Sequence, residues 1–389
     1  MRLRALSSGV GAIAVLLVAA ALPSATAAPA ASAAPTAEAM AEYRRKLEVY
    51  RVAHDAFERR AGAYWDAVAA KRRARNAKRR AGQAILLEDY VLTQPPVYTG
   101  PPRPVDPSAP GEPPPRKYVP VVTDFLMAAA EHFNFVPQRA TNEIDFKRAY
   151  AQAAAAVGLT RDQVVRIYGF EASGNGRNDV QAGLEYSASA RAISTALGYN
   201  QLLATNTVEI LAENGARFVA VLKARAAALT GATRHAMERK IAVLQHMIEF
   251  CRTVPDDWNA QDRLANTPKG WAVHAMVLDI DVGPLLQTQK LLDSIIFARR
   301  KGYAAPLSAA ELEMMNLTGD GNGFDMVTMP QALREQVPTA NFFQRGGYAR
   351  NPVASRNNTV AKLIAVTNAR MDKEAQLPGA RELASVYPQ

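Results

Sequence analysis

The stretch TRDQVVRIYGFEASGNG, residues 160–176, predicts both a helix and the place where that helix stops. Thr160 and Gln163 have the spacing of a capping box, in which each side chain hydrogen-bonds to the other residue's backbone at a helix start. Residues 173–176 supply serine, glycine and asparagine, which are typical of the turn that ends a helix. We therefore expect a helix that ends abruptly just after Glu171.

Glu171 stands on the apolar face of this expected helix. Val164, Ile167 and Tyr168 precede it by seven, four and three residues, so they share its face. Burial among apolar side chains disfavours a charged carboxylate and raises its pKa from about 4.3. Such a carboxyl is suited to general acid catalysis. We expect Glu171 to lie at the rim of a cleft; a glutamate that points to solvent is the alternative.

The rest of the chain predicts a mainly α fold. Ser308 with Glu311 and Asn206 with Glu209 repeat the capping-box spacing. The helix that Asn206 opens is expected to end at Asn214-Gly215. The sequence contains neither an internal repeat nor runs of alternating β-branched residues flanked by turn signals.

Residues 1–27 have the layout of a secretory signal peptide. Arg2 and Arg4 precede an apolar run over 10–22, and residues 25–27 (ATA) form a small-residue cleavage site. The apolar run is shorter than the roughly 20 residues of a membrane-spanning helix, although an uncleaved anchor is the alternative. We therefore expect an exported protein of the periplasm or cell envelope.

Composition divides the remainder into a basic helical region over 28–92, a proline-rich linker over 93–117 and a main helical domain over 118–389. Residues 95–115 hold 10 prolines in 21 positions, which excludes a helix and favours an extended spacer. From Tyr43 onward, apolar and aromatic residues recur at steps of three and four. A helix with this repeat either packs on the main domain or dimerises, and the oligomeric state stays open.

The net charge of +10 is concentrated in the N-terminal third. Residues 28–117 carry 16 basic and 10 acidic side chains, against 28 and 26 in residues 118–389. The densest run is KRRARNAKRR, residues 71–80. In an exported protein we expect this run to meet an anionic membrane surface or an acidic wall polymer rather than nucleic acid. A solvated helix face is the alternative.

A second motif, ALGYNQLL, occupies residues 196–203. Together with FEASGNG it resembles the lytic transglycosylases, lysozyme-like enzymes related to goose-type lysozyme. Glu171 matches the catalytic acid of that family, and Gly198 and Gln201 match the last glycine and the glutamine of its second motif. The resemblance implies a lysozyme-like helical domain in which Ser173, Gly198, Tyr199 and Gln201 bind substrate.

The same resemblance implies cleavage of the β-1,4 bond between N-acetylmuramic acid and N-acetylglucosamine in peptidoglycan, without a cofactor. Glu171 would protonate the bridging oxygen and then accept the proton of the muramyl 6-hydroxyl, which leaves a 1,6-anhydro end. An ordinary hydrolase would need a second carboxylate. Asp179, Glu185 and Glu209 are the nearest in sequence.

The sequence also departs from the family. Ala172 occupies the place of the usual serine, Gln201 follows Glu171 by 30 residues, and the family's third motif, an aromatic-Asn-x-Gly element, is not recognisable. One alternative is therefore a non-catalytic peptidoglycan-binding or envelope scaffold protein with a lysozyme-like fold. Another is an interaction protein whose working part is the basic region.

Other segments favour structural roles. GDGNGFD, residues 319–325, lacks two of the ligand positions of a calcium loop and is expected to be an Asx-rich turn. The five histidines show no zinc-site spacing, so we expect no metal. Cys251 lies on an apolar stripe and is expected to be a buried thiol. The loop over 341–358 suits sugar binding and an ordinary surface equally.

Overall fold

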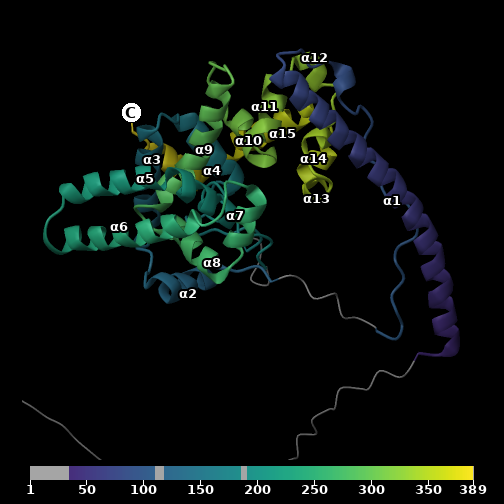
Figure 1. Cartoon of the computed structure of the whole chain (residues 1–389), viewed down its shortest axis with the longest axis horizontal. Coiled ribbons are helices and arrows are strands. Elements are labelled where there is room, and N and C mark those ends of the chain that lie inside the picture. Colours follow the sequence, from purple (N-terminus) through teal and green to yellow (C-terminus); the bar gives the residue numbers. More distant parts are fainter. Residues whose placement is uncertain (1–34, 110–117, 185–190, 389) are drawn as a thin grey trace, which may run out of the picture. The chain divides into compact units, whose positions relative to one another are not determined.

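The computed structural model describes residues 35–109, 118–184 and 191–388 (Figure 1). It is 66% helical and has no strand within those ranges, which confirms the predicted mainly α fold. The expected signal peptide, residues 1–27, and Glu185 lie outside the described residues.

The described helices occur along the chain in the following order: α1 (Ala37–Arg80), η1 (Leu87–Asp89), α2 (Val122–Phe133), α3 (Glu143–Ala156), α4 (Arg161–Glu171), α5 (Ala204–Ala227), α6 (Gly231–Cys251), α7 (Trp258–Ala265), α8 (Pro268–His274), η2 (Ala275–Leu278), α9 (Gly283–Arg300), α10 (Ala309–Thr318), α11 (Asp320–Thr328), α12 (Gln331–Arg334), η3 (Thr339–Phe342), α13 (Arg345–Ala349), α14 (Pro352–Arg356), α15 (Val360–Glu374) and α16 (Pro378–Ser385). Contacts divide the described chain into two units. The main unit contains the described residues of 54–99 and 113–389, and the smaller one those of 1–53 and 100–112.

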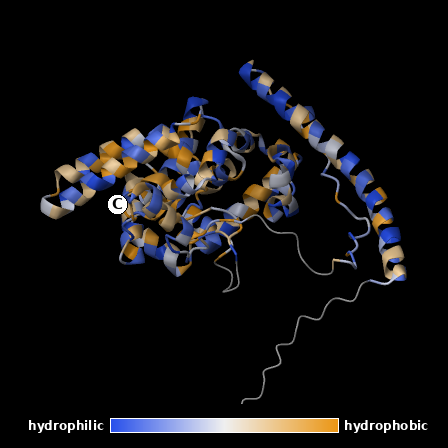
Figure 2. Ribbon diagram, turned by 60° about the horizontal axis from the view of Figure 1, so that its bottom comes forward, coloured by the Kyte–Doolittle hydropathy of each residue, from blue (hydrophilic) through white to orange (hydrophobic). Residues whose placement is uncertain are grey.

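The main unit has two apolar clusters. One joins α3, α4, α10 and α15 with residues of α1, and the other joins α2, α5, α6 and α8. In the second cluster α5 and α6 lie side by side as a hairpin (Figure 1, Figure 2). Cys251 at the end of α6 is fully buried, as the sequence predicts, and burial raises the pKa of its thiol to about 12.

The α5–α6 contact explains why the expected stop at Asn214-Gly215 is wrong. Helix α5 continues through both residues to Ala227. A Cβ atom on Gly215 would lie 2.4 Å from Cγ1 of Ile248 on α6, so the glycine permits close approach of the two helices instead of ending one. The start predicted at Asn206 is also wrong, because α5 begins at Ala204 and Asn206 accepts a hydrogen bond from the backbone of Leu203.

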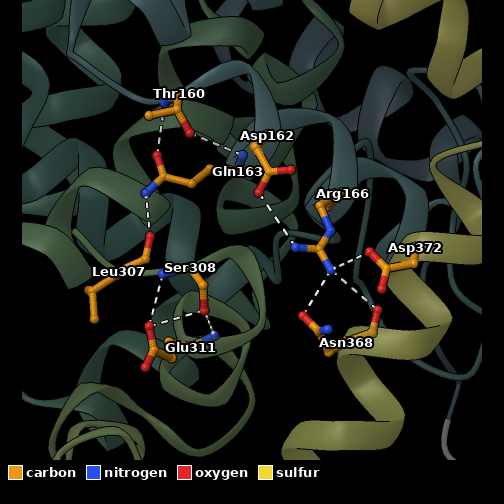
Figure 3. Close-up of polar contacts among 9 residues, drawn as sticks. All are labelled: Thr160, Asp162, Gln163, Arg166, Leu307, Ser308, Glu311, Asn368 and Asp372. Atoms are coloured by element: carbon orange, nitrogen blue, oxygen red, sulfur yellow. Dashed lines mark hydrogen bonds and ion pairs between the residues drawn. The ribbon is translucent and has the colours of Figure 1, made fainter.

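The other two predicted capping boxes are confirmed, and they meet (Figure 3). Thr160 with Gln163 caps α4, and Ser308 with Glu311 caps α10. The amide Nε2 of Gln163 also donates to the carbonyl oxygen of Leu307 at 2.7 Å, which ties the start of α4 to the start of α10. This hydrogen bond therefore fixes the start of α4 against the start of α10.

Arg166 joins α4 to α15 one turn further along. Its guanidinium donates to Asn368 Oδ1 at 2.8 Å and to Asp372 Oδ1 at 2.7 Å, and it also pairs with Asp162 (Figure 3). Helix α4 is thus held at two levels by α10 and α15.

The C-terminal half of α1 packs on the main domain. Ala61, Tyr64 and Val68, which belong to the heptad repeat, are buried there. Arg75 is fully buried as well; it donates to the carbonyl oxygen of Asp89 at 3.0 Å and lies 4.3 Å from the centre of the Tyr90 ring. Of the two expectations for this repeat, packing on the domain accounts for its last three positions, Ala61, Tyr64 and Val68.

Much of the basic run 71–80 is used inside the main unit. Arg72 donates to the carbonyl oxygens of Asn341 and Phe343, and Arg75 and Arg79 pair with Asp325. Lys78 pairs with Asp89, and Lys71 donates to the backbone of Glu88. Arg73 and Arg80 are the exposed arginines of the run.

Two predicted loops are packed structure. Residues 319–325 are not an Asx-rich turn, because Gly319, with φ 81°, separates α10 from α11 and the next residue already begins α11. In the stretch 341–358 the aromatic rings of Phe342, Phe343 and Tyr348 are buried against the core, so they do not form a sugar-binding surface.

In the smaller unit, the first turns of α1 and the prolines of residues 101–107 line a groove of about 860 Å³. Tyr43 and Val49 supply its apolar floor on the helix side. Val49 is 61% exposed, whereas Tyr43, Leu47 and Tyr50, which belong to the repeat of three- and four-residue steps, are half-buried.

The buried charges on α1 predict how strongly that helix depends on Asp325. Replacing Asp325 by Ala leaves Arg75 buried without its carboxylate, and we expect the free energy of unfolding to fall by about 3 kcal/mol. Urea denaturation measures this change. Arg73→Ala, which removes an exposed charge from the same run, should stay within about 0.5 kcal/mol of the wild type. A similar loss in both variants would contradict a specific role for the buried pair.

Candidate active site

Glu171 is the last residue of α4 and is half-buried. Val164, Ile167 and Tyr168 on the same face are fully buried, as the sequence predicts. The helix stops because Ser173 and Gly174 adopt left-handed backbone conformations, with φ 57° and 64°. The carboxyl of Glu171 therefore projects from the end of a buried helix face.

The turn after Glu171 is pressed against the C-terminal helices. A Cβ atom on Gly174 would lie 2.5 Å from the carbonyl oxygen of Glu374, at the end of α15. Asn175 accepts a hydrogen bond from the backbone N–H of Gly379 on α16 at 3.0 Å. Position 174 therefore requires glycine for two reasons: the left-handed backbone conformation and the close contact with Glu374.

Helix α10 brings two further polar side chains to Glu171. Asn316 Nδ2 donates to Glu171 Oε1 at 2.8 Å. Glu313, one turn earlier on α10, hydrogen-bonds to Glu171 through its carboxyl group and is only 1% exposed. Its Oε2 atom is buried and has no hydrogen-bond partner in the described part of the chain.

Burial controls the protonation of both carboxyls. It raises the pKa of Glu171 to about 7, although the hydrogen bond from Glu313, the charge of Arg370 and the hydrogen bond from Asn316 act in the opposite direction. The pKa of Glu313 is raised well above its usual range by burial and by the charge of Glu171. The pKa values of both carboxyls are therefore raised, and the more deeply buried Glu313 is the one whose ionised form is shielded from water.

Arg370 on α15 is the charged group that faces this pair. Its guanidinium lies 4.6 Å from the centre of the Phe170 ring and donates to the Phe170 carbonyl oxygen at 3.2 Å. Its Nε donates to Glu374 at 2.9 Å, and 40% of the side chain is exposed. The site therefore has a cation at its solvent side.

The second motif is folded back onto the loop that follows Glu171. The backbone N–H of Gly198 donates to the carbonyl oxygen of Val180 at 2.9 Å, and the half-buried Gln201 donates to the same oxygen at 3.1 Å. Both residues have left-handed backbones, with φ 82° for Gly198 and 45° for Gln201. The segment is a tight turn held by residue 180.

Tyr199 supports this turn from inside the protein. It is fully buried, its hydroxyl donates to Glu143, and its ring lies 4.6 Å from that of Tyr168. The second motif therefore touches α4 one turn before Glu171. Ser173, in contrast, is exposed two residues after it.

Sequence reasoning missed Glu313, Asn316 and Arg370. The carboxylates closest to Glu171 in sequence are engaged elsewhere, because Asp179 pairs with Arg139 and Glu209 accepts from Asn206. A signal for Glu313 was present, since Ala309 and Ala310 precede it by four and three residues and place it on an apolar helix face. That is the pattern that identified Glu171.

The described residues contain no group of three or more histidine, cysteine, aspartate or glutamate side chains arranged to hold a metal ion. Within residues 319–325, Asp320 accepts from Ser294 and Asp325 pairs with Arg75 and Arg79. None of the described helices has the length and apolar content needed to cross a bilayer.

The chain matches no protein-family model, and no similar protein is found among the curated proteins or the solved structures. The resemblance to lytic transglycosylases therefore rests on the residues of this sequence alone.

The raised pKa of Glu171 predicts a pH-dependent stability. The folded protein binds this proton more tightly than the unfolded chain, so between about pH 4.5 and 7 ionisation of Glu171 costs stability as the pH rises. Glu171→Gln removes that cost. We expect the variant to be more stable than the wild type by about 3 kcal/mol at pH 8 and nearly equal to it at pH 4.

Urea denaturation at both pH values measures the difference. Glu131→Gln is a matched control, because Glu131 is an exposed glutamate on α2. An equal stability difference at pH 4 and pH 8 would show that Glu171 has an ordinary pKa.

Proposed function

We propose that the protein is an exported lytic transglycosylase that cleaves peptidoglycan strands, with Glu171 as the general acid and base. The observation that carries the proposal is a half-buried carboxyl with a pKa raised to about 7 at the end of an apolar helix face. A pKa near the working pH suits a group that must first give a proton and then take one back.

The arrangement of carboxyls favours a single catalytic group. Glycoside hydrolases hold their two carboxyl groups about 5–5.5 Å or about 6.5–9.5 Å apart, on either side of the scissile bond. Glu313 is in direct hydrogen-bond contact with Glu171 and is buried behind it, so it has no access to the other face of a sugar. It is not placed as a hydrolase's second carboxyl.

A single carboxyl can complete the reaction when the nucleophile belongs to the substrate. Glu171 gives its proton to the glycosidic oxygen as the bond to the anomeric carbon breaks. The resulting carboxylate accepts the proton of the muramyl 6-hydroxyl while that oxygen bonds to the anomeric carbon. An internal hydroxyl held close to the reacting carbon has a high effective concentration, so water does not need to be activated.

Asn316 adds support to the resemblance. It lies in the sequence Met315-Asn316-Leu317-Thr318-Gly319 and donates directly to Glu171. These residues resemble the family's aromatic-Asn-x-Gly element with a methionine for the aromatic residue and one additional position before the glycine. The departure explains why the motif is not recognisable from the sequence alone.

The proposed substrate contacts differ in exposure. Ser173 is exposed beside Glu171, and Gln201 is half-buried, so these two are the proposed sugar-binding side chains of the predicted set. Gly198 and Tyr199 are buried and are proposed to hold the binding segment in shape. The exposed arginines Arg73 and Arg80 remain the proposed contact with an anionic membrane surface or wall polymer.

Glu171→Gln tests the catalytic role. We expect release of soluble muropeptides from purified sacculi to fall at least about 100-fold, because general acid–base catalysis contributes that much or more. Glu131→Gln should release muropeptides at the wild-type rate. Binding of wild type and variant to sacculi without release from either would favour the non-catalytic, wall-binding alternative.

The products test the kind of cleavage. If the muramyl 6-hydroxyl is the nucleophile, the fragments carry 1,6-anhydromuramic ends, which are lighter by one water than reducing ends and resist borohydride reduction. Mass analysis before and after borohydride treatment distinguishes the two. Mainly reducing muramic ends would overturn the lytic mechanism and leave a hydrolase.

A further inference from the structure

Glu313 is the buried ionisable group that the proposed mechanism does not use. It lies on α10 with 1% of its surface exposed, and its Oε2 atom has no hydrogen-bond partner in the described residues. Buried polar atoms in folded proteins are nearly always hydrogen-bonded. An unpaired carboxyl oxygen beside Glu171 therefore needs a reason.

The protonation state of Glu313 follows from its surroundings. An ionised carboxylate in this position would be a second negative charge in contact with Glu171 and shielded from water, which is strongly unfavourable. Arg370 faces both carboxyls, but its own partner is Glu374. A protonated carboxyl has one O–H to donate.

Asn316 limits which neighbour can accept a hydrogen bond from the O–H of Glu313. The Nδ2 of Asn316 is a donor, and it already points at Glu171 Oε1 at 2.8 Å. Although burial raises the pKa of Glu313, a hydrogen bond from Asn316 acts in the opposite direction, so the amide acts as a donor toward both carboxyls and not as an acceptor. Glu171 is the remaining neighbour that accepts, so Glu171 receives one hydrogen bond from an amide and one from a carboxylic acid, both carried by α10.

We propose that Glu313 is a positioning residue that stays protonated throughout the reaction and stabilises, by donating its hydrogen bond, the carboxylate that Glu171 forms when it gives up its proton. The inference rests on the proposed function. The proton of Glu313 does not leave; the glycosidic oxygen gains the proton of Glu171, and the sugar hydroxyl returns one. Burial alone would raise the pKa of Glu171 so far that it would be too weak an acid. A hydrogen bond donated to its carboxylate lowers that pKa and so offsets the effect of burial.

Two substitutions distinguish the effect of the hydrogen-bond donor of Glu313 from the effect of the volume of its side chain. Glu313→Gln keeps a donor at this place without an acidic proton, and Glu313→Leu removes the donor but keeps a similar volume. We expect turnover of sacculi to fall by less than about 3-fold for Glu313→Gln. For Glu313→Leu we expect a fall of about 10- to 100-fold, the effect of losing a hydrogen bond to a charged group.

Infrared titration of Glu171 provides a readout that does not depend on activity. The carboxyl band of Glu171 is isolated as the difference between each protein and the same protein with Glu171→Gln. We expect its pKa to rise by at least one unit in Glu313→Leu and to stay within one unit of the wild type in Glu313→Gln. A protein that releases no muropeptides but shows these shifts would refute the proposed function and retain the role of Glu313.

Three outcomes overturn the proposal. Equal Glu171 titration in the Leu variant and the wild type would show that Glu313 donates nothing, and equal shifts in both variants would show that it only fills space. If Glu313→Leu does not fold, the wild type is compared with Glu313→Gln at pH 8. A protonated carboxyl band present in the wild type and missing from the variant supports the proposal, and its absence from the wild type overturns it.

Discussion

The contact between α4 and α10 places the half-buried carboxyl of Glu171 against the fully buried carboxyl of Glu313, and contacts around the two helices keep this pair in place. Two like charges in contact within a protein cannot both be ionised without a large energetic cost, so the pair retains a proton. The capped starts of both helices, joined by Gln163 and Leu307, fix their relation. Arg166 then ties α4 to α15, which carries the arginine that faces the pair.

A second set of buried charges is arranged in a different way. Arg75 on α1 is fully buried, but it meets the opposite charge of Asp325, the carbonyl oxygen of Asp89 and the face of Tyr90. Such a set satisfies its charges and serves to attach one element to another. In the Glu171–Glu313 pair, two groups of like charge face each other, which attachment alone does not explain. The contrast supports structural use of the first set and chemical use of the second.

Local patterns predicted what depends on local physics. The helical class, the caps at Thr160 and Ser308, and the apolar face that ends at Glu171 all follow from neighbours within one or two turns. Gly215 gave a wrong prediction of the end of α5, because the sequence does not distinguish a glycine that permits close helix packing from one that ends a helix. Glu313 was missed because it is 142 residues from Glu171. The sequence of each helix predicts its own apolar face, but it does not predict which other helix that face packs against.

Distance along the chain also hides how the second motif reaches Glu171. Gln201 follows Glu171 by 30 residues, more than in the lytic transglycosylases that the two motifs resemble. Gly198 and Gln201 nevertheless both donate to the carbonyl oxygen of Val180, nine residues after Glu171. The ring of Tyr199 then packs on Tyr168, in the last turn of α4. A loop closed at both ends can lengthen at little entropic cost, because that cost grows only with the logarithm of its length. The long spacing of the two motifs in the sequence is therefore compatible with contact between the second motif and the helix that carries Glu171.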